Sequence, residues 1–270
     1  MDNPDLFAAA RDGRLAALPA ATLTAEALLK ANASGNTPLH LAAKYGHLDQ
    51  VPPALLTAAN LLHKNDAGYS PLHLAARHGH LGQVPASLLT AENLLVRSNS
   101  GYTPLHQAAA AGALDQVPAS LLSPALVLTK TDSGSTLLHV AAEHGTLDRF
   151  PNTYLSRETL TTANMSGETV LHVAVFNGHL DQVPRALLTS ETLLTKTANH
   201  DTCLHAAAIA GHLDQIPAEF LTHDNLVLPS KSGHTPIHAA AESGHLGQIP
   251  RDRLTVDLLL QTAGFEAGFD

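Results

Sequence analysis

The chain has 270 residues, of which 44% are hydrophobic and 14% charged, so it can bury a continuous core and is not expected to be disordered as a whole. Its formal net charge of −9 disfavours a nucleic-acid partner, because that kind of binding needs a dense set of Lys and Arg. Cys203 is the only cysteine, which excludes an intrachain disulfide and is typical of a reducing compartment.

The first residues do not resemble a targeting signal. They read Met1-Asp2-Asn3-Pro4-Asp5 and lack the basic start and apolar core of a signal peptide. No stretch of the sequence approaches the ~20 apolar residues of a membrane span. We therefore expect a soluble, cytoplasmic protein with no membrane partner, and we expect it to be monomeric.

A four-residue motif recurs along the chain with a constant period of 33 residues. It first appears as Thr37-Pro38-Leu39-His40, and a glycine follows the histidine at a fixed distance. The histidines of the motif stand at 40, 73, 106, 139, 172, 205 and 238, and the glycines at 46, 79, 112, 145, 178, 211 and 244. Seven occurrences in register indicate an internal repeat.

Each motif predicts the start of a short helix. Thr37 is placed to cap the helix N-terminus, and Pro38 suits the first position because its missing amide costs nothing there. Ala42 and Ala43 lie on one stripe and let neighbouring helices approach closely. Gly46 suits a left-handed residue at the helix end. The spacing thus predicts a first helix of roughly nine residues in every repeat.

The second half of each repeat predicts a broken outer helix. A proline inside a straight helix would cost ~3 kcal/mol, and here one recurs in every repeat. A second helix-start residue follows each proline, most clearly at Ser123-Pro124. The prolines stand at 52, 85, 118, 151, 184, 217 and 250, and the start residues at 57, 90, 123, 156, 189, 222 and 255. We predict that this helix is split into a short turn and a second short helix.

The 33-residue unit and its Thr-Pro-Leu-His-x-Ala-Ala signature resemble the ankyrin repeat family. The resemblance covers essentially the whole chain and implies an all-α helical repeat solenoid. It implies seven full repeats and an N-terminal capping unit in which Leu6, Phe7, Ala9 and Gly13 are in register. The split second helix is similar to a subset of bacterial ankyrin arrays.

A single solenoid over 1–270 is the domain organisation that we expect. It comprises an N-terminal cap unit at 1–33, a repeat array at 34–246 and a C-terminal cap and tail at 247–270. The first unit carries Arg11, Asp12 and Arg14, which suit the wet face that a solenoid end requires. The tail carries Phe265 and Phe269.

The eighteen histidines raise the question of a metal site or a proton relay. Seven of them occupy the motif position, where the ankyrin family uses the imidazole to tie turns and neighbouring repeats together. Five more follow the helix-ending glycine and suit the turn: His47, His80, His179, His212 and His245. One histidine per layer makes a ladder, whereas zinc needs three or four ligands around one point. We therefore expect no metal, no cofactor and no catalytic residue.

Two further features have structural interpretations. Gln50 and its equivalents recur in six repeats, with Arg149 as the exception, and we expect their amides to satisfy backbone groups where the outer helix breaks. Cys203 lacks an activating basic neighbour that is free of the repeat, so we expect a buried, inert thiol.

The ankyrin resemblance implies that a partner lies across the turn tips and the exposed side of the first helices. Positions there that vary between repeats are the candidates for specificity. Three of the four tyrosines fall among them, which favours an interface with an aromatic patch in the first three repeats. The candidate partner-binding residues are Tyr45, Tyr69, Arg77, His78, Tyr102, Glu143, His144, Met165, Phe176 and Ile209.

The function that we expect is non-enzymatic binding of a partner protein or peptide on the concave face. A passive spacer or assembly scaffold is the alternative, for which the exposed tyrosines are unexpected. A histidine-dependent metal-binding or catalytic protein is a third interpretation, and no convergent set of polar residues favours it. The fourth to sixth repeats are irregular, since Leu137, Val170 and Cys203 replace proline; a bend, a partner-specific site and drift are all open explanations.

Overall fold

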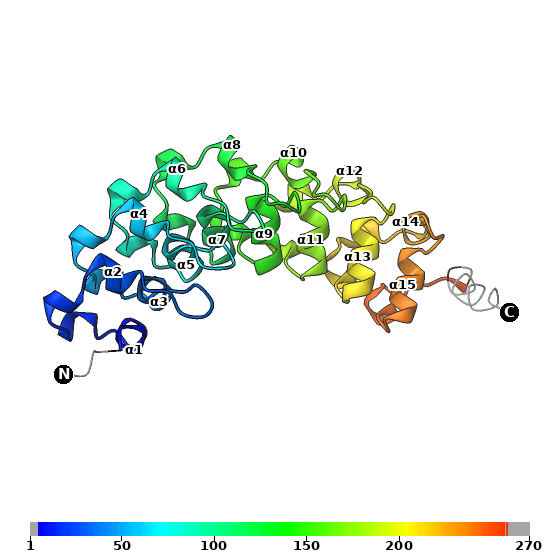
Figure 1. The fold of residues 1–270 in the computed structure, drawn as a ribbon. Helices are drawn as coiled ribbons and strands as arrows, with labels where there is room; N and C mark the ends of the chain where they lie inside the picture. The colour runs from blue at the N-terminus through cyan, green and yellow to red at the C-terminus, as the bar shows by residue number, and fades with distance from the viewer. Residues whose placement is uncertain (1–4, 257, 259–270) are drawn as a thin grey trace. The chain divides into compact units, whose positions relative to one another are not determined.

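The computed structural model describes residues 5–256 and 258, which form α-helices and short 3-10 helices (Figure 1). Within this range the extended pairings are two isolated bridges, Lys130 with Thr136 and Ala163 with Thr169. The chain divides into two compact units, unit 1 at Met1–Val140 and unit 2 at Ala141–Asp270. The predicted all-α repeat architecture is confirmed, and the single domain over 1–270 with its cap boundaries stays a prediction.

Each repeat begins with an inner helix that the sequence motif caps. In α3 (Pro38–Tyr45), Thr37 Oγ1 accepts a hydrogen bond from the His40 amide, and Pro38 lies in the first turn. Gly46 ends the helix at φ 76°, and a Cβ there would lie 2.9 Å from the His80 ring, so both the backbone and the neighbour require glycine. The other inner helices are α1 (Leu6–Arg11), α5 (Pro71–Arg77) and α7 (Pro104–Ala110) in unit 1, α11 (Val170–Phe176), α13 (Cys203–Ala210) and α15 (Pro236–Glu242) in unit 2, and α9 (Leu137–His144) across the boundary.

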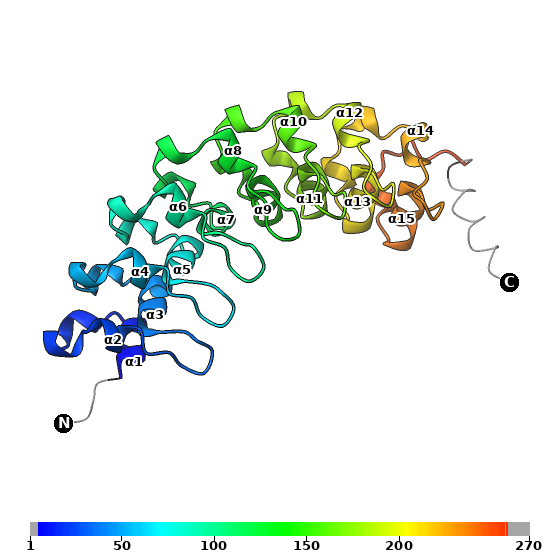
Figure 2. The same ribbon diagram turned by 45° about the horizontal axis from the view of Figure 1, so that its top comes forward.

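Successive inner helices pack against one another within each unit. In unit 1 the neighbours are α1, α3, α5 and α7, and in unit 2 they are α11, α13 and α15. Ala42 and Ala43 of α3, with Ala75 and Ala76 of α5, are fully buried, which lets the helix axes come close. Within each unit the inner helices form one layer and the shorter outer helices a second layer (Figure 2).

The outer half of each repeat is broken more finely than the sequence predicts. Instead of a turn and a helix it contains two 3-10 turns and one α-helical turn. Pro52 lies between the two 3-10 turns at φ −50° and ψ 129°, so it interrupts no α-helical hydrogen bond and its expected cost does not arise. Thr57 caps the α-turn by accepting from the Asn60 amide, as predicted.

The outer elements follow one pattern as far as α14, and the last repeat contributes η15. In unit 1 they are η1 (Leu15–Ala17), η2 (Ala20–Thr22), α2 (Ala25–Leu28), η3 (Leu48–Gln50), η4 (Pro53–Leu55), α4 (Ala58–Leu61), η5 (Leu81–Gln83), η6 (Ala86–Leu88), α6 (Ala91–Leu94), η7 (Leu114–Gln116), η8 (Ala119–Leu121) and α8 (Pro124–Val127). In unit 2 they are η9 (Leu147–Arg149), η10 (Asn152–Tyr154), α10 (Arg157–Leu160), η11 (Leu180–Gln182), η12 (Arg185–Leu187), α12 (Ser190–Leu193), η13 (Leu213–Gln215), η14 (Ala218–Phe220), α14 (His223–Leu226) and η15 (Leu246–Gln248).

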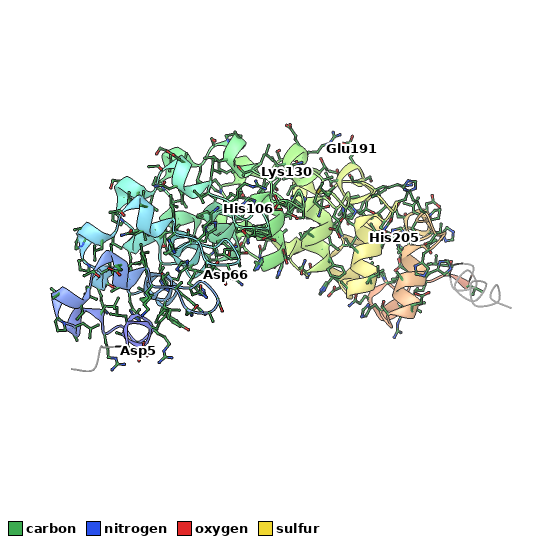
Figure 3. All side chains as sticks on the ribbon, in the orientation of Figure 1. Asp5, Asp66, His106, Lys130, Glu191 and His205 are labelled. Carbon is green, nitrogen blue, oxygen red and sulfur yellow. The ribbon has the colours of Figure 1, made fainter. Side chains whose placement is uncertain are left out.

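The motif histidines join consecutive repeats. His40 Nδ1 accepts from the Thr37 amide at 3.2 Å, so Nε2 carries the proton and donates to the Tyr69 carbonyl of the next repeat at 3.1 Å. Burial lowers the pKa of His40, His73 and His106 to about 4, which keeps the rings neutral. His106 and His205 point into the interior of unit 1 and unit 2 respectively (Figure 3). The predicted structural role of these rings is confirmed.

The recurring glutamines satisfy backbone groups, as predicted, and they do so across repeats. Gln83 Nε2 donates to the Gly46 carbonyl at 2.7 Å, and Gln83 Oε1 accepts from the Leu48 amide at 3.0 Å. Gln215 repeats both bonds in unit 2. The backbone where the inner helix ends is thereby tied to the next repeat.

The turn tips that precede the inner helices are linked by backbone hydrogen bonds. Asp66 donates from its amide to the Ser34 carbonyl in unit 1, and Ala198 donates to Ser166 in unit 2. His200 adopts φ 66° where the other tips have glycine. At the N-terminus, Asp5 caps α1 and Asp12 pairs with two exposed arginines. Phe265 and Phe269 lie outside the described residues.

Candidate partner-binding face

The sequence-predicted site residues lie on what we call the inner-helix face, the exposed side of the inner helices together with the turn tips. Arg77, His78, Glu143 and His144 are exposed at the C-terminal ends of α5 and α9. Four large apolar side chains of the prediction are also exposed to solvent. They are Tyr45 at 42%, Met165 at 79%, Phe176 at 52% and Ile209 at 51%.

The three tyrosines occupy two different places. Tyr69 and Tyr102 sit in turn tips, half-buried, with their rings edge-on to His73 and His106 at 5.6 and 5.8 Å between centroids. Tyr45 is the last residue of α3, at the end of the inner helix opposite the turn tips, and its ring lies 5.2 Å from Lys44 Nζ. The tip tyrosines therefore contribute packing to the motif histidines as well as surface.

Unit 1 carries a pocket of about 370 Å³ on this face. Its walls come from the turn tips and from the two adjacent helices α3 and α5. Two cations and a histidine stand at the helix C-terminal side, two amides at the tip side, and two leucines between them. The lining residues are Asn36, Leu41, Lys44, Asn65, Leu74, Arg77 and His78.

Unit 2 carries a pocket of about 190 Å³ at the corresponding place between α11 and α13. Phe176 and Ile209 stand where unit 1 has its cations, and Glu168 and Asp201 supply two carboxyl groups at the tips. Glu168 accepts a hydrogen bond from Asn164 Nδ2 at 2.9 Å. The lining residues are Ser166, Glu168, His172, Phe176, Thr197, Asn199, Asp201, Ala206 and Ile209.

The two pockets are built from equivalent positions, 132 residues or four repeats apart. Lys44 corresponds to Phe176 and Arg77 to Ile209, while Asn36 corresponds to Glu168. The same scaffold thus presents cations in one unit and apolar side chains with carboxylates in the other.

The overall charge follows the same division. Residues 1–140 contain eight basic and nine acidic residues, and residues 141–270 contain seven basic and fifteen acidic ones. Nearly all of the net negative charge therefore belongs to unit 2, whose field attracts positively charged partners. Near the unit 1 pocket, partial burial and the charges of Lys44 and Arg77 lower the pKa of His78.

The described residues offer little for catalysis. Within 5–256 and 258, no group of three or more His, Cys, Asp or Glu is arranged to hold a metal ion. Cys203 is fully buried in α13, and burial raises the pKa of its thiol far above the ordinary range, so the nucleophilic thiolate does not form. Over the same residues, the helices are too short or too polar to cross a bilayer.

Two family models match the chain over this region. One, described as three copies of ankyrin repeats, matches residues 53–124, and the single ankyrin repeat matches residues 34–66. Residues 34–124 are therefore ankyrin repeats. The matched residues include both helices of the unit 1 pocket. No curated protein gives a significant match to the sequence.

Sequence reasoning found the residues at the ends of the inner helices and missed the pocket walls. Leu41 and Leu74 follow the motif histidine directly, where they resemble ordinary core positions, yet both are only partly buried. Asn65 is not recognisable as a pocket residue from the sequence, because its position suits a structural role in the turn tip. There its Oδ1 accepts hydrogen bonds from the amides of Ala67 and Tyr69. The sequence signal is the side chain one residue past the motif histidine, which is Leu41 and Leu74 in unit 1 and Val173 and Ala206 at the equivalent positions of unit 2.

Proposed function

We propose that this protein binds a partner protein or peptide on the inner-helix face, the concave face of the expected solenoid. It acts without catalysis or a cofactor, as a cytoplasmic monomer, and it does not bind nucleic acid. Ankyrin repeats are in general protein–protein interaction modules, which supports this class of function.

One observation carries the proposal: two large apolar side chains stand half-exposed on adjacent helices of one pocket. Phe176 of α11 and Ile209 of α13 are 52% and 51% exposed and line the same unit 2 pocket. A water-exposed aromatic beside an aliphatic residue, with carboxylates at the rim, has the composition of an interface hot spot. A passive spacer has no use for this exposure.

Replacing both side chains by serine removes the apolar contact. Half of each side chain remains to be buried by a partner, worth about 1 kcal/mol apiece, so Phe176→Ser with Ile209→Ser should weaken binding about 30-fold. The measurement is affinity capture from native lysate, followed by titration calorimetry with the captured partner after purification. Val256→Ser is the matched control, because Val256 is 71% exposed and lines neither described pocket.

The expected result is a partner retained by the wild type and by Val256→Ser and lost by the double variant. Thermal unfolding of all three proteins checks that the repeats stay folded. Equal retention of the partner by all three proteins contradicts the proposed site, and a wild type that retains no partner favours the spacer.

A further inference from the structure

We infer that the unit 1 pocket binds an acidic peptide segment, with Lys44 and Arg77 holding a carboxylate of the segment between α3 and α5. The inference rests on the proposed function in one respect, since it places part of a peptide partner on the inner-helix face. It adds a second site with its own ligand chemistry.

The pocket has hydrogen-bond donors at both ends and no negatively charged side chain in its lining. Lys44 and Arg77 stand at one end, and none of the seven lining residues is acidic. At the other end Asn36 Oδ1 accepts from Asn65 Nδ2 at 2.8 Å, which leaves Asn36 Nδ2 as a donor. Leu41 and Leu74 lie between and can contact the aliphatic part of a glutamate side chain. This arrangement matches an anionic group on a short apolar stem.

The two cations of the pocket differ from most arginines of the chain. Seven arginines pair with an Asp or Glu, among them Arg97 with Asp132 and Arg185 with Glu219. Within residues 5–256 and 258, Arg77 and Lys44 have no ion pair; Lys44 instead lies near the face of the Tyr45 ring. Among the described residues, Arg77 and Arg251 are the arginines without an ion pair, and a ligand carboxylate in the pocket would give Arg77 and the neighbouring Lys44 a partner.

The pKa of the neighbouring His78 responds to the positive charges of the pocket. Partial burial lowers the pKa of His78, and the positive charges of Lys44 and Arg77 lower it further. A bound carboxylate would offset those charges and raise the His78 pKa. His78 is therefore a built-in reporter of occupancy.

A peptide carboxylate fits the surroundings better than a nucleic-acid phosphate. A polyanionic backbone would extend beyond the pocket over unit 1, where nine acidic residues outnumber eight basic ones, so it lacks the dense set of Lys and Arg that such a ligand needs. One or two acidic side chains need only the local cations. The planar guanidinium of Arg77 can donate hydrogen bonds to both carboxylate oxygens, which adds direction to the contact.

The test uses a short fluorescein-labelled peptide of alternating glutamate and glycine, measured by fluorescence anisotropy on the full chain. Lys44→Gln with Arg77→Gln should weaken binding about tenfold, because two partly exposed ion pairs are lost. Lys30→Gln with Lys64→Gln is the matched control, since it removes the same charge from exposed residues outside the pocket. In NMR titrations, the peptide should raise the pKa of His78 in the wild type.

Equal weakening in both double variants would overturn the inference, because binding would then follow net charge alone. A phosphoserine peptide that binds while the glutamate peptide does not would assign the pocket to phosphate instead. Self-association that is lost in the Lys44 and Arg77 variant would show a second copy as the occupant. The assay involves neither Phe176 nor Ile209, so its failure is distinguishable from failure of the proposed function.

Discussion

The two pockets are the most informative comparison in the molecule. Each lies between two adjacent inner helices at the same positions of the repeat, and yet Lys44 and Arg77 in unit 1 become Phe176 and Ile209 in unit 2. The residues that hold the helices in place are of the same kind around both pockets. In each unit a motif histidine takes part in the cap of the inner helix, and a glutamine bonds the backbone of the previous repeat. The repeat thus separates the positions that build the scaffold from those that set the chemistry of the surface.

The largest expected effect is a loss of folding stability at low pH, and it tests whether the two units share one scaffold. The pKa of His40, His73 and His106 is about 4 in the folded protein against 6.5 ordinarily, so between these values the unfolded chain binds more protons. Stability is fully present above about pH 6.5 and falls as the pH drops towards 4, by up to about 3 kcal/mol per histidine. Urea unfolding, followed by circular dichroism at several pH values in this window, measures the loss.

Burial also lowers the pKa of His172 and His205, so unit 2 should lose stability in the same direction. The control is His144→Gln, which removes an exposed imidazole and leaves every motif histidine in place. A flat profile between pH 6.5 and 4 would show that the motif histidines are not held neutral.

Removing one motif histidine from each unit sharpens the comparison. His73→Ala removes the ring that accepts from the Ser70 amide and bonds the Tyr102 carbonyl, and His205→Ala removes the equivalent bonds to Thr202 and His234. Each variant should lower the free energy of unfolding by about 3 kcal/mol, because buried polar groups lose their hydrogen bonds. Chemical denaturation of both variants is the measurement. A large loss in one variant and none in the other would contradict a common scaffold.

The sequence predicts the scaffold well because its signals are local. Thr37, Pro38 and Gly46 each suit one backbone position of the helix, namely its N-cap, its first residue and its left-handed end. The structure confirms all three. The proline at 52 predicts a break, although not its form, since the choice between 3-10 and α turns depends on packing against the next repeat.

The binding surface is less predictable because it depends on contacts between repeats. Tyr69 and Tyr102 are expected on the surface as candidates for an aromatic patch, yet their rings pack on His73 and His106. A tyrosine has an apolar ring and a polar tip, so the sequence alone does not decide between these environments. The unit 1 pocket likewise needs Asn65 and Leu74 from one repeat beside Lys44 from the previous one, a juxtaposition that only the packed helices create.

The smallest expected effect, an exchange of pocket residues, tests the division between scaffold and surface most directly. Lys44→Phe with Arg77→Ile gives unit 1 the side chains of unit 2, and binding of the alternating glutamate and glycine peptide should weaken about tenfold. In unit 2, Phe176→Lys with Ile209→Arg should not suffice to bind this peptide, because Glu168 and Asp201 still repel a carboxylate.

Adding Glu168→Asn and Asp201→Tyr to that unit 2 pair supplies the side chains found four repeats earlier, at Asn36 and Tyr69. The fourfold variant should bind a second equivalent of the peptide, because the backbone and the motif histidines around both pockets are alike. Titration calorimetry measures the stoichiometry, and thermal unfolding checks the fold. A stoichiometry that stays at one, in a variant as stable as the wild type, would mean that the anion site also needs unit 1 side chains that the variant lacks, such as Asn65 and Leu74, and that these four positions alone do not set the chemistry of the surface.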